Sequence, residues 1–317
     1  GCVALGFLSS WFWFLLIFVL AQAAYSLSLI FYDSMLTDVT TEERMDEVSS
    51  RGYAWGYIGS CVPFLISLAL VLFYETLGIS MNLAMSIAFL LIAVWWVCFA
   101  VPLLRSYKQL HCIENHDHAV SSGLRRLGHV FGELKKNKKI LFFLIAFFFY
   151  IDGVYTIIDM ATAYGTALGL DTTGLLLALL VTQIVAFPAA LIFGRLSGKY
   201  KNASLIKICI AAYFLIALYG ITLKEQYQFW ILAVCVGIFQ GAIQSLSRSY
   251  FARIIPAERS GEYFGIYDIC GKGASFLGTT LVSAMSQLTG NMNLGVGSLA
   301  VMFLIGFFFF LRTEKLS

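Results

Sequence analysis

Nine apolar runs, each long enough to cross a lipid bilayer as a helix, divide the sequence. They cover residues 11–32, 53–74, 83–104, 140–166, 173–194, 204–223, 228–248, 263–288 and 293–311. Residues 1–8 resemble the end of one more run, and roughly 20 apolar residues are enough to span the hydrocarbon core. Hydrophobic residues make up 60% of the chain and charged residues only 12%, which is not typical of a soluble domain. The pattern predicts an all-α, polytopic transmembrane helical bundle with about nine complete spans plus a stub of a tenth.

The basic residues fall in every second loop. Of the 21 lysines and arginines, all but Lys224 and Lys272 lie in one set of loops or at the ends of the runs beside them. Loops rich in Lys and Arg stay on the cytoplasmic side of a membrane. We therefore expect these loops and the C-terminus to be cytoplasmic. The seven cysteines form no CxxC pair, and we interpret them as small buried side chains without a disulfide framework.

The longest loop, residues 105–139, is predicted to be a cytoplasmic linker. Its first part is polar and contains His111, Cys112, His116 and His118. Their spacing matches no structural zinc pattern, so we predict a solvated linker and no metal, although a metal site is conceivable. The second part, residues 121–139, predicts an amphipathic helix with an apolar stripe of Leu124, Leu127, Val130, Phe131 and Leu134. Basic residues beside the stripe (Arg125, Arg126, Lys135 and Lys136) suit anionic lipid headgroups, or else a calmodulin-like partner.

The sequence also repeats itself at an offset of 215 residues. The matching pairs are Ser34 and Ser249, Glu43-Arg44 and Glu258-Arg259, Glu47 and Glu262, Gly56 and Gly271, and Ser60 and Ser275. Each set lies where one span ends at a charged turn and the next begins. The interval implies two six-span units in the same orientation, a parallel repeat of the kind that major-facilitator transporters use.

This repeat predicts the domain organisation. Residues 1–104 would be a partial N-terminal bundle, holding the end of span 3 and spans 4–6, followed by the linker at 105–139. Residues 140–317 would be a C-terminal six-helix bundle. On this interpretation roughly the first two and a half spans are missing from the sequence, and we expect it to be a fragment.

One loop resembles a known signature. Gly194-Arg195-Leu196-Ser197-Gly198-Lys199 resembles the major-facilitator loop motif G-x-L-x-D-R-x-G-R, with Gly198 where the motif has Asp. The resemblance implies a cytoplasmic gating role for Gly194, Arg195 and Lys199, and an ordinary positive-inside turn is the alternative. We expect the repeated charged turns to take part in gating as well, through Glu43, Arg44, Arg51, Glu258 and Arg259.

Three further stretches resemble one family in that superfamily. They are Phe31 to Leu36 with Ser49 to Gly59, then Tyr150 to Ile157, and Gln244 to Pro256 with Phe264 to Asp268 and Gly271-Lys272. They are similar to the fungal vacuolar amino-acid effluxer linked to autophagy and its bacterial relatives. The resemblance implies a transporter in the cell (plasma or inner) membrane, or alternatively a vacuolar-type membrane. It also implies that runs 11–32, 140–166 and 228–248 are spans 4, 7 and 10, which line the cavity.

Charged side chains inside the spans are the candidate solute or proton site. Asp268 and Lys272 are one helical turn apart, and Asp152 and Lys272 lie at a similar depth, about 15–18 Å from the ends of their runs. Lys272 is therefore expected to pair with Asp268, with Asp152, or with each in turn. Asp159 is expected at the outer mouth. The neutral candidates for the site are Tyr155, Gln240, Gln244, Gln22 and Tyr25. A static ion pair with glutamines that merely join helices is the alternative, but intramembrane charges usually have a functional role.

Together these features predict a secondary active transporter. It would move a small polar solute, with amino acids as the best candidate, by alternating access, and protons are a candidate coupling ion. A non-transporting receptor or scaffold that keeps the transporter fold is the alternative. No phosphate loop, H-E-x-x-H or nucleophile elbow occurs, so we predict no enzyme activity, cofactor or nucleic-acid partner.

Overall fold

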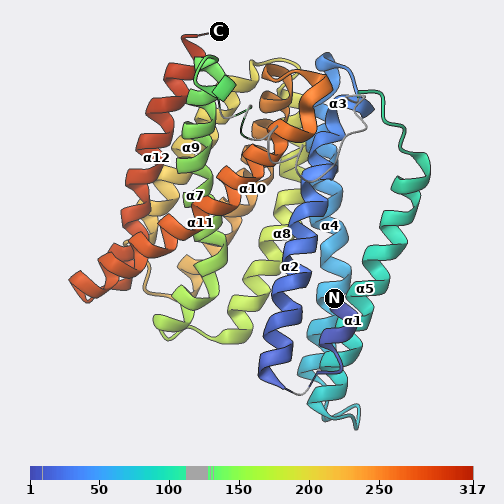
Figure 1. Cartoon of the computed structure of the whole chain (residues 1–317). Coiled ribbons are helices and arrows are strands. Elements are labelled where there is room, and N and C mark those ends of the chain that lie inside the picture. Colours follow the sequence, from blue (N-terminus) through green and yellow to red (C-terminus); the bar gives the residue numbers. More distant parts are fainter. Residues whose placement is uncertain (9, 112–127, 129, 131, 317) are drawn as a thin grey trace.

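The computed structural model describes residues 1–8, 10–111, 128, 130 and 132–316, and in this part of the chain every regular element is a helix (Figure 1). The helices are α1 (Cys2–Leu5), α2 (Trp11–Ser34), α3 (Leu36–Val39), α4 (Met45–Leu72), α5 (Met81–Ser106), α7 (Lys138–Ala167), α8 (Thr172–Leu196), α9 (Asn202–Gly220), α10 (Gln226–Ile254), α11 (Ser260–Thr289) and α12 (Met292–Glu314). Short 3-10 turns, η1 (Glu42–Arg44) and η2 (Ala257–Arg259), precede α4 and α11. The prediction of an all-α bundle is confirmed.

Among the described residues, eight helical segments are long and apolar enough to cross a membrane. They contain α2 with α3, α4 with η1, α5, α7, α8, α9, α10 and α12. The remaining predicted span, 263–288, lies in α11, which has the length of a span but contains Glu262, Asp268 and Lys272. The predicted stub at residues 1–8 contains only the single turn α1. The protein is a multi-pass integral membrane protein. Its described part contains eight spans that meet these criteria, and α11 is a further, more polar helix of spanning length.

The helix ends repeat at the interval expected from the sequence. The span Trp11–Val39 and helix Gln226–Ile254 are each 29 residues long, and both of their ends are 215 residues apart. The turns η1 and η2, and the starts of α4 and α11, obey the same offset. Even an ion pair is repeated, with Arg44 3.8 Å from Glu47 and Arg259 2.8 Å from Glu262. The internal repeat is therefore confirmed by the backbone.

Aromatic side chains and glycines pack the helices that follow the linker. The ring of Phe303 on α12 lies against Gly153 on α7, where a Cβ atom would come within 2.6 Å of the ring. In the reverse sense, a Cβ at Gly306 on α12 would lie 2.9 Å from the Cβ of Tyr150 on α7. Gly153 thus makes room for a ring of α12, and Gly306 for the backbone and Cβ of Tyr150, which brings the two helix backbones close together.

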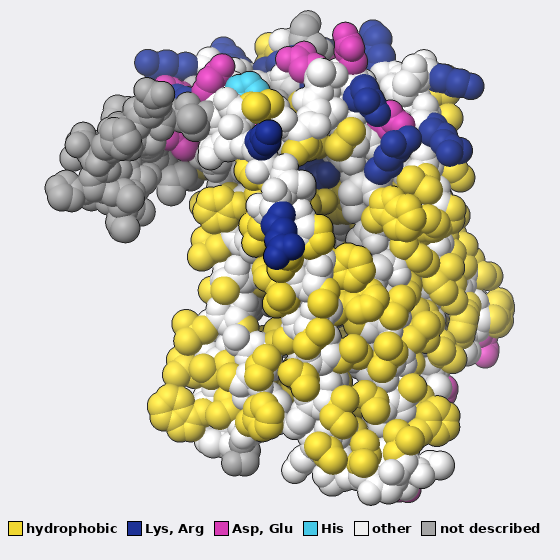
Figure 2. Space-filling model, turned by 90° about the vertical axis from the view of Figure 1, so that its right-hand side faces the viewer, with side chains coloured by type: hydrophobic (Ala, Val, Ile, Leu, Met, Phe, Trp, Pro, Cys, Tyr) yellow, Lys and Arg dark blue, Asp and Glu magenta, His cyan; other side chains and the backbone are white. Residues whose placement is uncertain are grey.

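One end of the molecule carries most of the charge, and we call it the basic end. It contains the start of α7, the end of α10 and the C-terminus, and Figure 2 shows most Lys and Arg side chains gathered there above a broad hydrophobic surface. Apolar side chains of α2 and α5, among them Trp11, Trp13 and Phe99, are more than half exposed in the protein alone. In a bilayer such surfaces face lipid or other spans.

The linker is described only in part. Cys112, His116, His118, Leu124, Arg125, Arg126, Leu127 and Phe131 lie outside the described residues. Val130 and Leu134 are buried in the protein core, so this part of the predicted apolar stripe faces protein, not lipid. Glu133 accepts a hydrogen bond from Arg259 at 2.6 Å and so joins the linker to the turn before α11. Among the described residues no group of His, Cys, Asp and Glu side chains could hold a metal ion.

Candidate functional site: charged contacts between the two sets of helices

The helices before the linker (α2 to α5, the N-terminal helices) pack against those after it (α7 to α12, the C-terminal helices). Helix α4 contacts α8 and α10, α2 contacts α11, and α3 contacts α10. Close packing between α4 and α8 depends on Gly194, where a Cβ would lie 2.7 Å from the Cβ of Ser50. The residues described next lie in this interface, which we call the interhelix interface.

A buried ion pair joins α2 to α10 in the interface. The Nη1 atom of Arg248 lies 2.9 Å from Oδ1 of Asp33, and the Arg248 side chain is only 3% exposed. Its Nε donates to the hydroxyl of Ser49 at 3.0 Å, and its Nη2 donates to the Ser49 carbonyl at 3.3 Å. One guanidinium therefore binds α2 and α4 together, with charge-assisted hydrogen bonds that are the stronger kind.

Two tyrosine rings enclose the same guanidinium. The Cζ atom of Arg248 lies 5.2 Å from the ring centroid of Tyr32 and 4.9 Å from that of Tyr53. Such cation–π contacts stabilise a charge that has lost its water. At Gly52 a Cβ would lie 2.8 Å from the Tyr32 hydroxyl and 3.4 Å from Nη2 of Arg248, so a side chain at position 52 would displace the ring.

Asp33 and Arg248 also occupy equivalent places in the repeat, since they are 215 residues apart. Parallel repeats in transporters are related by a pseudo-two-fold axis along the membrane normal. Two equivalent residues can touch only if both lie close to that axis. The ion pair is therefore at the centre of the interface, between the two units of the repeat.

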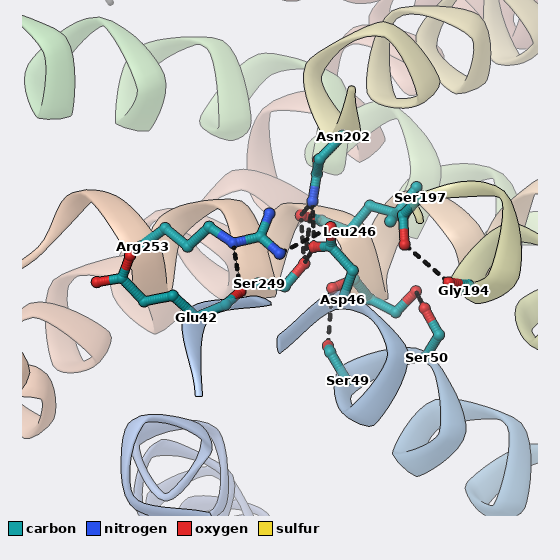
Figure 3. A network of polar contacts seen from close by, with 11 residues as sticks. Glu42, Asp46, Ser49, Ser50, Gly194, Ser197, Asn202, Leu246, Ser249 and Arg253 are labelled. Carbon is teal, nitrogen blue, oxygen red and sulfur yellow. Dashed lines mark hydrogen bonds and ion pairs between the residues drawn. The ribbon is translucent and has the colours of Figure 1, made fainter. Parts of the chain in front are cut away.

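A second network lies nearer the basic end (Figure 3). The Oδ1 atom of Asp46 accepts hydrogen bonds of 2.5 Å from both Asn202 and Ser249, and its Oδ2 is 2.8 Å from Nη2 of Arg253. Arg253 also donates from Nε to the carbonyl of Glu42 at 3.1 Å. This places the start of α4 against the start of α9 and the end of α10. We call this set the Asp46 network.

Serines complete the contact between α4 and α10. The Ser49 hydroxyl donates to the Ser245 carbonyl at 2.7 Å, and the hydroxyls of Ser50 and Ser245 are 3.1 Å apart. All three serines are at most 1% exposed. Further along the same two helices, the Tyr57 hydroxyl donates to Oε1 of Gln244 at 3.2 Å.

The predicted pair of Asp268 and Lys272 is present in the structure. The Lys272 ammonium lies 2.7 Å from Asp268, and it donates to the Ser26 carbonyl of α2 at 3.3 Å. Lys272 thus connects α11 to α2 across the interface. The Asp268–Lys272 pair is also within electrostatic range of Asp33, so the structure gathers two acids and two bases in one region.

Asp152 has neutral hydrogen-bond partners on α7 and α11. Its Oδ1 atom accepts from the Gly278 amide at 3.0 Å and from the Thr156 hydroxyl at 3.2 Å, both neutral groups. Lys272 forms its ion pair with Asp268. Of the pairings predicted from the sequence, the structure therefore contains the one between Lys272 and Asp268. Asp159, two turns further along α7, is exposed.

The neutral candidates divide between two places. Tyr25, like Asp33, is within electrostatic range of Asp268, and Tyr155 is in range of both acids. Gln22 is exposed on α2, one turn before Ser26. Gln244 lies in the interface through Tyr57, whereas Gln240 is buried and lines a pocket among the C-terminal helices.

Most of the predicted gating residues lie beside the interface. Arg195, Lys199, Glu43, Arg44, Arg51 and Glu258 are exposed, while Gly194 is buried against α4. Arg51 pairs with Glu47 at 2.6 Å within α4, and Arg259 binds Glu133 and Glu262. The interface is made instead by residues to which the sequence analysis gave no gating role, namely Asp33, Asp46, Ser49, Asn202, Arg248, Ser249 and Arg253. The sequence contained a signal for the Asp33–Arg248 pair, because these two residues immediately precede the matched residues Ser34 and Ser249.

The start of the linker is tied to α3. The hydroxyl of Tyr107 donates to Oδ2 of Asp38, and His111 contacts Oδ1 of Asp38 with its amide at 3.0 Å and its Nδ1 at 2.8 Å. Burial and the hydrogen bond to Asp38 together raise the pKa of Tyr107 to about 12. Tyr107 therefore stays a neutral hydrogen-bond donor throughout the physiological range.

Comparison with known proteins places this geometry in a family. The family model described as "Vacuole effluxer Atg22 like" matches residues 3–315. The chain is 40% identical over 298 residues to an uncharacterized MFS-type transporter, YxiO, of Bacillus subtilis, which covers 93% of this chain and 70% of YxiO. It is 28% identical to autophagy-related protein 22 of Eremothecium gossypii, over 80% of this chain and 53% of that protein. The chain spans about half the length of the fungal relatives it matches.

Solved structures show the same fold. The chain superposes on the major facilitator superfamily transporter FucP in the outward conformation with a TM-score of 0.64 at 13% identity, covering 89% of this chain and 71% of FucP. An outward-facing bacterial homologue of the iron transporter ferroportin gives a TM-score of 0.57 at 14% identity, covering 88% and 66%. These relatives are transporters, not enzymes, as the sequence analysis predicted. The chain belongs to the Atg22-like vacuole effluxer family and is a membrane transporter of the major facilitator type.

Proposed function

We propose that the protein moves a small polar solute across the membrane by alternating access. The observation that carries this proposal is the Asp33–Arg248 ion pair, buried on the axis between the two units of the repeat. Burying charges is costly, and a static scaffold gains little from placing a breakable pair between two rigid units. A transporter needs bonds of this kind, because its two bundles must close firmly at one end and then separate.

The basic end is proposed to be cytoplasmic, in agreement with the positive-inside rule. Polar contacts between the N-terminal and C-terminal helices bind residues 33–57 to residues 202–253, and most of these residues are close to that end. Such contacts favour a state closed on the cytoplasmic side. Opening this side would break the Asp46 network first and the Asp33–Arg248 pair deeper in the interface.

The solute site is proposed to lie between α2 and α11. Asp268 and Lys272 offer one negative and one positive group, and their side chains remain 18% and 35% exposed. Tyr25, Gln22, Tyr155 and Gln244 are the neutral groups that we assign to the same site. A zwitterion can replace both partners of the pair at once, which suits amino acids as the solute class.

We propose protons as the coupling ion, and the Asp268–Lys272 pair as the place where they bind. Protonation of Asp268 would release Lys272 to bind the carboxylate of a solute. Replacement by Asn (Asp268→Asn) should then abolish stimulation of uptake by a pH gradient. Stimulation that persists in this variant would exclude Asp268 as the proton carrier.

The direct test is uptake into proteoliposomes that contain the purified protein. We expect accumulation of one or more radiolabelled amino acids, and at least a tenfold loss of initial rate in Lys272→Met. Lys224→Met is the matched control, because Lys224 is exposed in the loop before α10 and should keep its rate. If no amino acid is transported or raises the thermal stability of the protein, a receptor or scaffold role gains support.

The bacterial relative favours the cell membrane as the location, and the fungal relatives a vacuolar one. Anionic lipid headgroups are proposed to bind the surface pocket lined by Lys136, Lys138, Lys139 and Tyr263, at the end of the linker. Phosphatidylglycerol should raise thermal stability more than phosphatidylcholine does. Equal effects of both lipids in the parent protein would exclude a headgroup site.

A further inference from the structure

A pocket among the C-terminal helices has no part in the proposed solute site. Its walls come from α7, α8, α10, α11 and α12, and most of the side chains that line it are apolar. Thr156, Gln183 and Gln240 are polar exceptions. Polar oxygens in an otherwise apolar pocket are the usual determinants of what it binds.

The register of α7 and α10 places two of these side chains at one level. The helices run in opposite directions, and the hydroxyls of Tyr150 and Ser247 meet at 2.6 Å. Thr156 follows Tyr150 by six residues and Gln240 precedes Ser247 by seven, which correspond to about 9 and about 10.5 Å along the two axes. Thr156 and Gln240 therefore face the pocket at about the same depth.

Asp152 lies beside this pocket, next to Thr156, which is one of the residues that line it. It is one turn before Thr156 on the same face of α7, and the Thr156 hydroxyl donates to its Oδ1 atom at 3.2 Å. The Asp152 side chain is fully buried. At Gly278 a Cβ would lie 2.6 Å from this Oδ1, so α11 fits closely against one side of the carboxylate.

Three oxygen atoms here have no hydrogen-bond partner among the described residues. They are Oδ2 of Asp152, Oε1 of Gln240 and Oε1 of Gln183. Asp152 and Gln240 are 0% and 5% exposed, so bulk water does not bathe them. An unpaired buried acceptor is costly, and a carboxylate without a counter-charge is more so.

The chemistry of these three unpaired oxygen atoms indicates which kind of ligand the pocket binds. All three atoms accept hydrogen bonds and none donates, so an anion or a second acceptor would be repelled. A proton on Asp152 would remove its charge but would leave the oxygens of both amides unpaired. Carboxylate, amide and hydroxyl oxygens are ligands for hard cations, and the single carboxylate balances a single charge.

We propose that this pocket binds a sodium ion, with Asp152, Thr156 and Gln240 as ligands and Gln183 close by. The proposal deepens the proposed function by adding an ion that the transporter binds apart from its solute. Sodium binding can be measured without any solute, so its failure and the failure of the transport proposal are distinguishable.

The test measures the melting temperature (Tm) of the purified protein in detergent. Sodium chloride is compared with choline chloride and potassium chloride at equal ionic strength and fixed pH. A ligand at 100 times its Kd should raise Tm by roughly 5 °C in a chain of this size. The proposal expects this rise with sodium only, and its loss in Asp152→Asn, Gln240→Leu and the nearly isosteric Thr156→Val.

Asp159→Asn is the matched control, because it removes the same charge from an exposed position on the same helix. It should keep the full sodium shift. A shift that follows pH instead of sodium would show a proton at Asp152 and overturn the proposal. A Tm that no cation changes in the parent protein would overturn it as well, and would indicate water in the pocket.

Discussion

Replacing Asp33 by Asn tests whether the buried ion pair holds the basic end closed. The Arg248 guanidinium is 3% exposed, so removing its counter-charge leaves a charge buried without compensation. Breaking such a pair costs about 3–5 kcal/mol in soluble proteins. Ser49 and the rings of Tyr32 and Tyr53 remain in place, so we expect a cost somewhat below that range, about 2–3 kcal/mol.

This cost applies only to the closed state, because opening exposes Arg248 to water. A shift of about 2–3 kcal/mol changes the ratio of open to closed molecules roughly 30- to 150-fold. The assay is maleimide labelling of Ser245→Cys in a background without native cysteines, in membranes whose basic face is accessible. Ser245 is fully buried between α4 and α10, so labelling reports separation of these helices.

We expect Asp33→Asn to accelerate labelling by at least tenfold. Glu75→Gln, an equivalent change at an exposed carboxylate just after α4, should leave the rate unchanged. The exchange Asp33→Arg with Arg248→Asp should slow labelling again, since it restores one charge of each sign. Equal labelling of the parent and Asp33→Asn would refute the reasoning that this pair closes the interface.

Other substitutions test neighbouring features. Gly194→Val should also accelerate labelling at Ser245→Cys, because its Cβ would lie 2.7 Å from Ser50; unchanged labelling would mean that α4 and α8 tolerate separation. In Gly306→Val the new side chain would meet the backbone of α7 at 3.0 Å, so we expect Tm to fall by about 5 °C, whereas Gly261→Ala, with nothing within 4 Å, should not lower it. Tyr164→Phe removes a hydroxyl that donates to the Gly220 carbonyl at 2.6 Å; we expect a loss of about 1–2 kcal/mol of stability, measured by thermal unfolding, and no loss would show that the bond is energetically neutral.

The fold could be derived from the sequence because bilayers constrain it strongly. Apolar runs of spanning length predicted the helices, and the matching charged turns predicted the repeat. The helix ends in the structure have the same 215-residue offset. The start of α4 was less well predicted. Its first residues are polar, and the sequence analysis began the corresponding run at residue 53, whereas the helix begins at Met45.

The interface was harder to predict, for a physical reason. Asp46 meets Asn202, 156 residues away, and Arg248 meets Asp33, 215 residues away. No helical period links such partners, and a search for identical residues in the repeat passes over a position where one copy has Asp and the other Arg. The i, i+4 pair of Asp268 and Lys272 was found because its geometry is local.

The position of the Asp33–Arg248 pair has a consequence for the origin of the protein. A residue on the axis between two identical subunits must face a copy of itself. Two aspartates or two arginines would repel each other there, so a symmetric ancestral dimer could not have contained this bond. The pair became possible only when the two copies could mutate independently, which requires duplication of the gene. This contact therefore records a divergence of the two copies that followed duplication.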